Sequence, residues 1–254
     1  MKIAVAYKWA PNPQDASVSQ EGTVDWGRAK AAISEYDQVA LEVGRRLADS
    51  AGAELVGISA GPADAGSSMA RKAALSRGLD RLAIVTDEAL AGATAGRTAR
   101  VLAEVVDQVG DVDLVLTGDS SVDLGAQLVP SVLGAVLGWP VLSNVTAITG
   151  SAGDLTVERS REGGTQTLRV TGPAVLAVAP DAAMPSVPGM KDILAAGKKP
   201  TDVLDVPVPD AEPVSVVATA PPEMKARKRQ IIDGSDPAAA AAELVAALRA
   251  DNLV

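Results

Sequence analysis

The chain has 254 residues and a formal net charge of −9 at pH 7, and it contains neither cysteine nor histidine. These absences exclude disulfides, thiolate nucleophiles, histidine-based triads and the usual zinc sites. Hydrophobic residues make up 47% of the chain but aromatic residues only 2%, so the core must consist of Val, Leu, Ile and Ala. The acidic balance disfavours nonspecific nucleic-acid binding. No apolar run approaches the roughly 20 residues of a membrane span, and the opening residues are too strand-like for a signal peptide, so we expect a cytoplasmic protein.

Short apolar runs alternate with helical patterns through the first half of the chain. The apolar runs, which predict buried strands, span residues 2–8, 54–61, 81–87 and 113–119. The helical patterns span residues 34–52, about 65–77, 94–110 and about 126–137. This alternation is typical of a mostly parallel, doubly wound sheet with right-handed crossovers. We therefore predict an α/β fold, with ligands outside the carboxyl ends of the strands.

The second half of the chain does not continue this alternation of strands and helices. Residues 155–170 predict a hairpin of two strands and residues 172–180 another apolar strand, so the sheet gains an antiparallel extension. A short helix is expected near Met190. The stretch 200–222 is rich in Pro and Val with few helix signals, and it predicts an extended arm.

The arm leads to a basic cluster and an Ala-rich amphipathic helix. Without aromatic residues and on an acidic background, the cluster at 225–230 indicates a solvated run or a subunit contact rather than a nucleic-acid site. Ser235 or Asp236 would cap the helix. Its apolar side would carry Leu244, Val245 and Leu248. We predict two parts: an α/β nucleotide-binding domain over 1–200, and over 201–254 an extended arm and C-terminal helix that contact a partner subunit.

A polar, glycine-containing stretch over residues 118–128 follows the fourth predicted strand. Its backbone N–H groups can bind a phosphate at the start of the next helix, where the helix dipole also favours an anion. Ser120 and Ser121 can add hydroxyl donors, and Asp123 can accept from a ribose or a purine amine, or orient the loop. Because neither a Walker A motif nor a GxGxxG fingerprint is present, a polar loop with an N-cap is the alternative to a nucleotide site.

Two further segments have both a structural and a functional interpretation. Asp37 can favour the first turn of the helix that it begins, or contact a nucleotide at the same sheet edge. Met190, Ile193 and Leu194 suit either a surface helix or a docking anchor, because a thioether adapts to differing pockets. The acidic residues offer no convincing acid/base pair, so we expect no catalytic residue and no metal site in this chain.

Taken together, these segments resemble the β-subunit of electron-transfer flavoproteins, especially the enterobacterial Fix type linked to carnitine metabolism. The resemblance covers nearly the whole chain. It rests on the order and spacing of KIAVAYKWAPNPQD, ISEYDQVALE, SAGPA, LSRGLD, GDSSVDLGAQ, LTVERSREGGTQTL, PAVLAV and MKDILAAGKKP. It implies an adenine-nucleotide α-hydrolase-like fold and a heterodimer whose α-subunit holds most of the FAD that carries electrons. It also implies that this subunit binds its own nucleotide, AMP in electron-carrying members and a second FAD in bifurcating ones.

Carried over to this chain, the resemblance places the nucleotide contacts at strand ends and in the loop after the fourth predicted strand. The implied cofactor-binding residues are Ala6, Ser34, Glu35, Tyr36, Asp37, Ala60, Gly118, Asp119, Ser120, Ser121, Asp123, Gly125, Ala126, Gln127 and Leu128. Residues 184–194 resemble the loop that docks on acyl-CoA dehydrogenases in the family. Met190 stands where the family has an apolar anchor, usually Leu, and Ile193 and Leu194 would add to the contact.

Several positions depart from the family pattern. The nucleotide loop is shorter than in electron-carrying members and lacks their acidic run after Asp123, whereas Gly125 replaces the Thr of bifurcating members. AMP and FAD therefore both stay open for this subunit. Ser160 stands where other members have a Glu that helps to hold the domains, and Glu162 is a nearby substitute. Residues 12–13 lie in the loop implied to approach the flavin of the α-subunit.

We therefore expect the β-subunit of a heterodimeric electron-transfer flavoprotein, which shuttles electrons through FAD to or from an acyl-CoA dehydrogenase-type partner. This chain alone would turn over no substrate. A stand-alone adenine-nucleotide sensor of the universal-stress type is the first alternative, since it shares the α/β rhythm and the phosphate loop but needs no arm. An AMP-forming or hydrolytic enzyme is the second, and would need an acid/base or metal-ligand cluster around Asp119 and Asp123.

Overall fold

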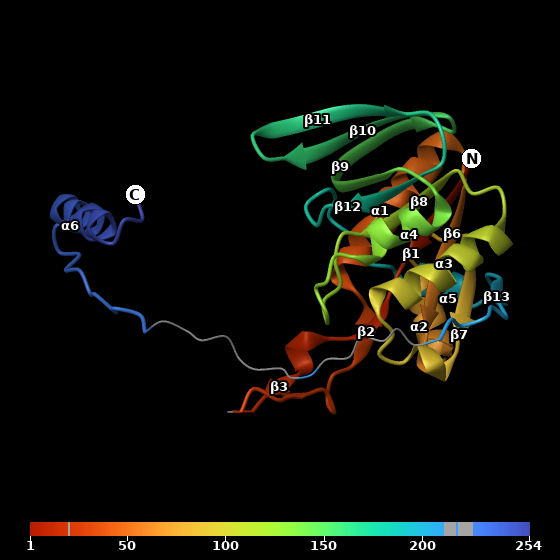
Figure 1. Ribbon diagram of the computed structural model, residues 1–254, viewed down its shortest axis with the longest axis horizontal. Coiled ribbons are helices and arrows are strands. Elements are labelled where there is room, and N and C mark those ends of the chain that lie inside the picture. Colours follow the sequence, from red (N-terminus) through yellow and green to blue (C-terminus); the bar gives the residue numbers. More distant parts are fainter. Residues whose placement is uncertain (20, 211–216, 218–225) are drawn as a thin grey trace. The chain divides into compact units, whose positions relative to one another are not determined.

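The computed structural model describes residues 1–19, 21–210, 217 and 226–254, and the chain divides into two compact units (Figure 1). The first unit is Met1–Val217 and the second is Ala218–Val254. The first unit contains the sheet and its covering helices. The described residues of the second include the helix α6 (Pro237–Ala250).

A nine-stranded mixed sheet forms the frame of the first unit within the described residues. Its strands are β1 (Lys2–Ala6), β6 (Glu54–Gly61), β7 (Arg81–Thr86), β8 (Leu114–Gly118), β9 (Val141–Ser151), β10 (Asp154–Arg161), β11 (Gly164–Val170), β12 (Ala174–Val178) and β13 (Thr201–Val203). They lie side by side in the order β11-β10-β9-β12-β8-β1-β6-β7-β13. Two small antiparallel pairs stand apart from it, namely β2 (Trp9–Pro11) with β5 (Ala31–Ile33) and β3 (Ser17–Val18) with β4 (Val24–Asp25).

The sheet is parallel from β9 to β13, and only the pairs β9–β10 and β10–β11 are antiparallel. The chain runs from β1 to β6 and β7 on one side of β1, and then returns with β8 on the other side. The strand order therefore reverses between β1 and β8. In open α/β sheets, a crevice for ligands forms outside the carboxyl ends of the strands at such a switch point.

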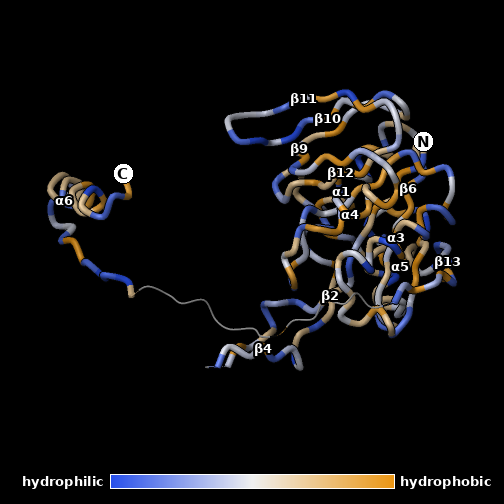
Figure 2. Tube along the Cα trace, viewed as in Figure 1, coloured by the Kyte–Doolittle hydropathy of each residue, from blue (hydrophilic) through white to orange (hydrophobic). Residues whose placement is uncertain are grey.

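Helices cover both faces of the parallel part of the sheet, which makes two apolar layers. On one face, α1 (Glu35–Ala51), α2 (Ser68–Leu75) and α5 (Met190–Ala196) pack against alternate strand residues such as Ile3 and Val5. On the other face, α3 (Ala95–Val109) and α4 (Val129–Leu137) pack against the residues between them, such as Ala4. Hydrophobic colours accordingly concentrate on the central strands in Figure 2. The described residues also form the short 3₁₀ helices η1 (Pro13–Asp15), η2 (Ala63–Gly66) and η3 (Glu88–Leu90).

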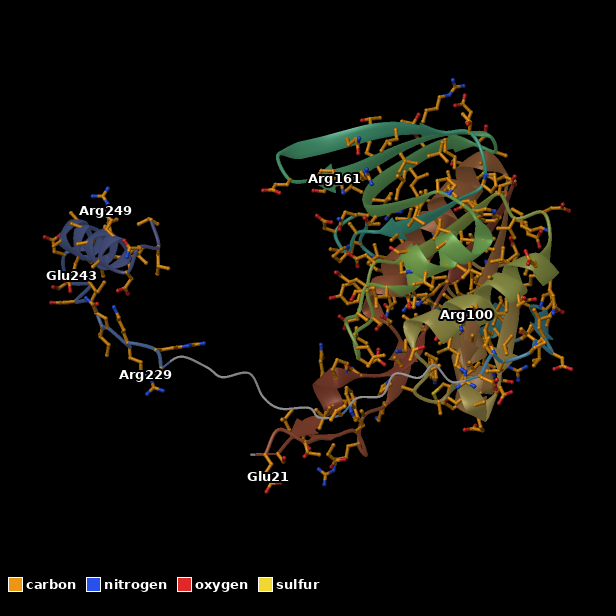
Figure 3. All side chains as sticks on the ribbon, in the orientation of Figure 1. Glu21, Arg100, Arg161, Arg229, Glu243 and Arg249 are labelled. Carbon is orange, nitrogen blue, oxygen red and sulfur yellow. The ribbon has the colours of Figure 1, made fainter. Side chains whose placement is uncertain are left out.

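The antiparallel extension is a long hairpin of β10 and β11 beside β9. Near its base, Leu155 and Val157 are buried against the face that α1 covers. Toward its free end the side chains are exposed, and Arg161 lies there in Figure 3. Ser160, where the resemblance implied a Glu, lies on this exposed part.

The observed fold confirms the predicted α/β class with its mostly parallel sheet and antiparallel extension. Some boundaries differ. The helix predicted at about 65–77 is α2 over Ser68–Leu75, preceded by η2. The helix predicted from about residue 126 begins at Val129, because Gly125 and Gln127 have left-handed backbones with φ of 62° and 54°. The eleven-residue strand β9 was not predicted at all.

The compact unit also runs past residue 200, where the sequence placed the start of the arm. Thr201–Val203 pairs in parallel with β7, and the Leu204 N–H donates to the Ile84 carbonyl at 2.8 Å. Val206 is buried beyond it. A strand of three residues, none of them buried, resembles loop in sequence, and its pairing partner lies more than a hundred residues earlier. The part of the predicted arm at 211–216 and 218–225 lies outside the described residues.

The described part of the second unit has no core of its own. Asp236 caps α6, since its Oδ1 accepts from the N–H groups of Ala238 and Ala239 at 2.9 and 3.3 Å. No residue of α6 is buried, and Leu244 and Val245 are 49% and 42% exposed. Figure 3 shows the charged side chains of Glu243 and Arg249 projecting from this helix. The predicted apolar side is therefore uncovered by the described residues.

Candidate functional site

Three segments meet at the carboxyl edge of the sheet between β1 and β8. They are residues 6–8 after β1, 34–37 at the start of α1, and 117–128 at the end of β8 and beyond, and we call them the switch-point corner. The register pairs Ala6 with Ile58, so the predicted residue Ala60 lies at the same edge on the neighbouring strand β6. The structure thus brings the predicted cofactor-binding residues of four separate segments to one edge.

Asp37 ties the corner together through its side chain. Its Oδ2 accepts from the Lys8 N–H at 2.8 Å, and its Oδ1 accepts from the Gly118 N–H at 3.2 Å. The Ser34 N–H donates in turn to the Lys8 carbonyl at 3.0 Å. A single carboxylate thereby joins the end of β1, the end of β8 and the first turn of α1. Both of its oxygens have protein partners, so its position in the structure is that of an internal tie.

The environment of Asp37 also changes its acidity. Its side chain is buried, at 6% exposed, and burial raises its pKa to about 7, although the two main-chain N–H donors act in the opposite direction. The Lys8 ammonium further lowers this pKa, and the carboxylate of Asp123 raises it. Asp37 therefore loses its proton near neutral pH, whereas an ordinary aspartate loses it at a much lower pH.

Gly118 lets α1 approach β8 closely at this corner. A Cβ built on Gly118 would lie 2.7 Å from Asp37 Oδ1 and 2.8 Å from the carbonyl carbon of Tyr36. Carbon atoms do not approach backbone this closely, so any side chain at Gly118 would push the start of α1 away. The glycine that ends the apolar run in the sequence is thus required by packing.

An ion pair closes the other side of the corner. Lys8 Nζ lies 2.6 and 2.8 Å from the two carboxylate oxygens of Asp123. Burial opposes ionisation of Asp123, but the hydrogen bond and the charge of Lys8 outweigh it and lower its pKa. Asp123 therefore stays ionised and holds the loop to the end of β1, in agreement with the predicted orienting role.

Several buried oxygens of the corner lack hydrogen-bond partners. They are Ser34 Oγ, Thr117 Oγ1 and Asp119 Oδ1, together with Tyr7 Oη. Burial, together with the charge of Asp181, raises the pKa of Asp119. Most buried polar atoms in folded proteins are paired, so three unpaired ones around Gly118 mark a place where the chain alone does not complete its hydrogen bonding.

The loop after Asp123 is open to solvent. Residues 124–128 are all exposed, and Leu124 and Leu128 reach 68% and 54% exposure. The left-handed backbones at Gly125 and Gln127 turn this loop before α4 begins. Exposed apolar side chains on a loop at a strand edge are unusual for a simple connection, and they suit a surface that another molecule covers.

Two residues of the corner were missed by the sequence reasoning. Lys8 is the last residue of the first predicted strand and Thr117 precedes Gly118, so their positions at strand ends were visible in the sequence. Lys8 meets Asp123, however, only because β1 and β8 are neighbours in the sheet, although more than a hundred residues separate them in the chain. The chain order does not reveal that adjacency.

The 184–194 segment lies apart from the corner, before and within α5. Its apolar side chains are exposed: Met184 86%, Val187 91%, Met190 73%, Ile193 43% and Leu194 69%. The Gly189 N–H donates to Asp192 Oδ2 at 2.9 Å and starts the helix. These exposures agree with the predicted surface helix and leave its side chains available to a partner.

Clefts, possible metal sites and possible membrane-spanning helices also bear on what the described residues can do. Two clefts of about 500 and 480 Å³ lie between α1 and β9 and at the amino ends of β1 and β6, and neither includes a corner residue. The described residues form no cluster of acidic side chains suited to a metal ion. None of the helices in the described part of the chain is both long and apolar enough to cross a membrane.

The fold is that of an α/β protein with a topological switch point between β1 and β8, where open sheets commonly form a ligand crevice, and the described residues hold no cluster of side chains suited to a metal ion. A family comparison is more specific. The family model described as electron transfer flavoprotein domain matches residues 22–209. The chain belongs to this family, whose members are electron-transfer proteins that bind flavin and work with partner subunits and dehydrogenases.

Proposed function

We propose that this chain is the β-type subunit of a heterodimeric electron-transfer flavoprotein, resembling the Fix type, and that its switch-point corner binds an adenosine phosphate. The nucleotide is AMP, or a second FAD if the complex bifurcates electrons. The FAD that carries electrons, held mainly by the α-subunit, supplies the redox chemistry. This chain binds the nucleotide, completes the heterodimer and presents a docking surface to an acyl-CoA dehydrogenase-type partner in the cytoplasm.

The unpaired buried oxygens of Ser34, Thr117 and Asp119 are the observation that carries the nucleotide proposal. An adenosine phosphate offers ribose hydroxyls and a purine amine as donors to such acceptors, and the two hydroxyls can donate to phosphate. Lys8 adds a cation at the same edge, because a phosphate can compete with Asp123 for its ammonium group. The exposed loop at 124–128 then covers the ligand.

The docking proposal concerns the 184–194 segment, which we call the docking segment from here on. Its five exposed apolar side chains come from a stretch of eleven residues. Two of them are methionines, whose flexible thioethers fit surfaces of different shape. Met190 at the first position of α5 is the proposed anchor, with Ile193 and Leu194 beside it.

The assembly proposal concerns the second unit. The uncovered apolar residues of α6 need a partner surface, and the α-subunit is the one that the family provides. Ending the chain after residue 222 should therefore weaken assembly with the α-subunit at least tenfold, as measured by analytical ultracentrifugation of the two subunits. Unaltered affinity would remove this role.

A count of bound cofactors tests the proposal directly. The chain is co-expressed with an electron-transfer flavoprotein α-subunit, the complex is purified and denatured, and released FAD and AMP are counted. A yellow 1:1 complex with one FAD and one AMP supports a simple carrier, and two FAD support bifurcation. A colourless homodimer that binds ATP would instead favour the adenylate sensor.

A pair of serines tests the corner itself. Ser34 and Ser59 are both 1% exposed, but Ser59 Oγ donates to the Tyr7 carbonyl at 2.8 Å whereas Ser34 Oγ has no partner. Ser59→Ala should therefore lower Tm without nucleotide, because it leaves a buried carbonyl unpaired. Ser34→Ala should keep Tm without nucleotide but shrink the rise in Tm that AMP or FAD produces. An undiminished rise would place the nucleotide elsewhere.

A further inference from the structure

A buried carboxylate of α1 lies outside the switch-point corner and has its own set of donors. Glu42 is 5% exposed, and Arg45 Nη2 and Arg46 Nε each lie 2.7 Å from its Oε1. Burial opposes its ionisation, but hydrogen bonds from Arg45, Arg46 and Ser186 outweigh it and lower its pKa to about 2. Glu42 is therefore ionised at neutral pH.

The second oxygen of Glu42 reaches across to the docking segment. The Ser186 hydroxyl donates to Glu42 Oε2 at 2.9 Å, and the Ser186 N–H lies 3.5 Å from the same oxygen. Residues 42 and 186 are far apart in the chain, so this contact joins a rigid helix of the sheet layer to a loop. A hydrogen bond to an ionised acceptor is stronger than one between neutral groups.

Two arginines hold the carbonyls of the same stretch. Arg46 Nη2 lies 3.5 Å from the Met184 carbonyl, and Arg77 Nη1 lies 3.4 Å from the Ser186 carbonyl. Arg77 is itself oriented by Gln38 of α1, whose Oε1 accepts from its Nη2 at 2.9 Å. The stretch 184–186 is thus held by its main chain and by one hydroxyl.

Apolar packing does little to hold this stretch. Met184 and Val187, on either side of Ser186, are 86% and 91% exposed. The nearest buried apolar side chain of α5 is Ala196, at the far end of that helix. The described hydrogen bonds to residues 184–186 all come from Glu42, Arg46 and Arg77, so these polar contacts restrain the first half of the docking segment.

We infer that Glu42 is a positioning residue for partner docking. Its charge fixes Arg45 and Arg46 on one side and Ser186 on the other, so the backbone before α5 has one position and Met190 is presented to the partner already ordered. An ordered segment binds with less loss of conformational entropy than a loose one. The docking part of this inference rests on the proposed function; the anchoring contact does not.

The test uses the complete heterodimer and four variants. Glu42→Gln removes the charge. Ser186→Ala removes only the bridging hydroxyl from an exposed residue, so it keeps the protein folded even where Glu42→Gln does not, and Ser186→Thr restores a hydroxyl. Asp49→Asn is the matched control, because Asp49 pairs with Arg45 at 2.9 Å but contacts no residue of the docking segment in any described hydrogen bond.

Two measurements are made on each variant. Hydrogen exchange of the peptide over 182–194, without a redox partner, should be roughly tenfold faster in Glu42→Gln and severalfold faster in Ser186→Ala. Electron transfer with an acyl-CoA dehydrogenase as the varied component should show a KM for that protein raised by about the same factors, with kcat and FAD content unchanged. Ser186→Thr and Asp49→Asn should behave like the wild type.

The outcomes separate the inference from the proposed function. Unchanged exchange in both Glu42→Gln and Ser186→Ala overturns the anchor. Faster exchange with an unchanged KM overturns the positioning role, and if Met190→Asp also leaves KM unchanged, the docking function itself fails. Faster exchange together with a raised KM, restored by Ser186→Thr, supports the inference.

Discussion

The switch-point corner and the docking segment of the same unit are both anchored by a buried carboxylate, but they expose different atoms. At the corner, the buried carboxylate of Asp37 fixes two main-chain N–H groups, and Gly118 has no room for a side chain. In the docking segment, a buried carboxylate again fixes the main chain, but the side chains point outward and Met190 is 73% exposed. A site for a small ligand and a surface for a protein thus share a means of anchoring and differ in what they expose.

This difference indicates what each region tolerates. The corner derives its geometry from main-chain atoms at the ends of two strands, so changes in volume or charge there should disturb the fold. The docking segment derives its affinity from exposed side chains on a fixed base, so changes there should disturb partner contact alone. The following predictions test that contrast, beginning with the largest expected effect.

Gly118→Ala should destabilise the protein by about 3 kcal/mol and abolish nucleotide binding, because the new Cβ overlaps Asp37 and the backbone of Tyr36. Urea denaturation measures the free energy of unfolding. Gly172→Ala is the matched control, since a Cβ there meets nothing within 4 Å and should cost little. If both variants lost the same stability, the close contact between Gly118 and the start of α1 would not explain the loss.

The raised pKa of Asp37 predicts a pH dependence of stability. A carboxyl whose pKa is about 7 in the folded state, against an ordinary value of 3.8 in the unfolded chain, stabilises the folded state at low pH, and this contribution is lost as pH rises through 7. Relative to Asp37→Asn, the wild type should lose on the order of 2 kcal/mol between pH 5.5 and 8. Denaturation curves at both pH values, above the pI of about 4.6, measure the difference. A constant difference would contradict a titrating Asp37.

Met190→Asp should impair transfer to the dehydrogenase, by about tenfold in the KM for that protein, because it places a charge in an apolar contact. The free energy of unfolding and the bound nucleotide should stay the same. Met69→Asp is the control, since Met69 on α2 is 72% exposed, almost the same as Met190. Equal loss in both variants, or loss of nucleotide in Met190→Asp, would count against the anchor.

Lys8→Met should lower the free energy of unfolding only a little, by under about 1 kcal/mol, because the lysine side chain is 39% exposed and the pair with Asp123 is screened by solvent. Nucleotide affinity should fall severalfold, as the corner loses its cation. Calorimetric titration with AMP measures this directly. A loss of several kcal/mol in stability, with unchanged affinity, would show that the pair serves the fold alone.

Many elements of the parallel core could be predicted because their apolar residues follow the pattern of either a buried strand or an amphipathic helix. The run KIAVA is apolar throughout, the helix at 35–51 carries its apolar residues at helical spacing, and Gly52 ends that helix in the left-handed conformation. The strand β9 was missed for the opposite reason. Asn144 interrupts it with a φ of 56°, and its pairing with β12 and β10 comes from segments that follow later in the chain.

The candidate site was predictable as a set of segments and not as a set of contacts. Polar and glycine residues after strands such as β8 indicated the edge, because parallel strands bring their carboxyl ends together. The sequence offered two roles for Asp37, a first-turn residue or a nucleotide contact, and neither describes the tie between Lys8 and Gly118. Glu42 was not singled out, since an acidic residue within a helix gives no sign of burial.

The sequence by itself determined the α/β class, the loops that follow the strands, the lack of imidazole and thiol chemistry, and the exposed character of the 184–194 segment, because composition and periodicity are local properties. Only the tertiary structure decided that β1 lies between β6 and β8, that Asp37 joins them, and that Glu42 holds Ser186. These depend on which distant segments become neighbours, and that choice is made by burying the two faces of the whole sheet at once.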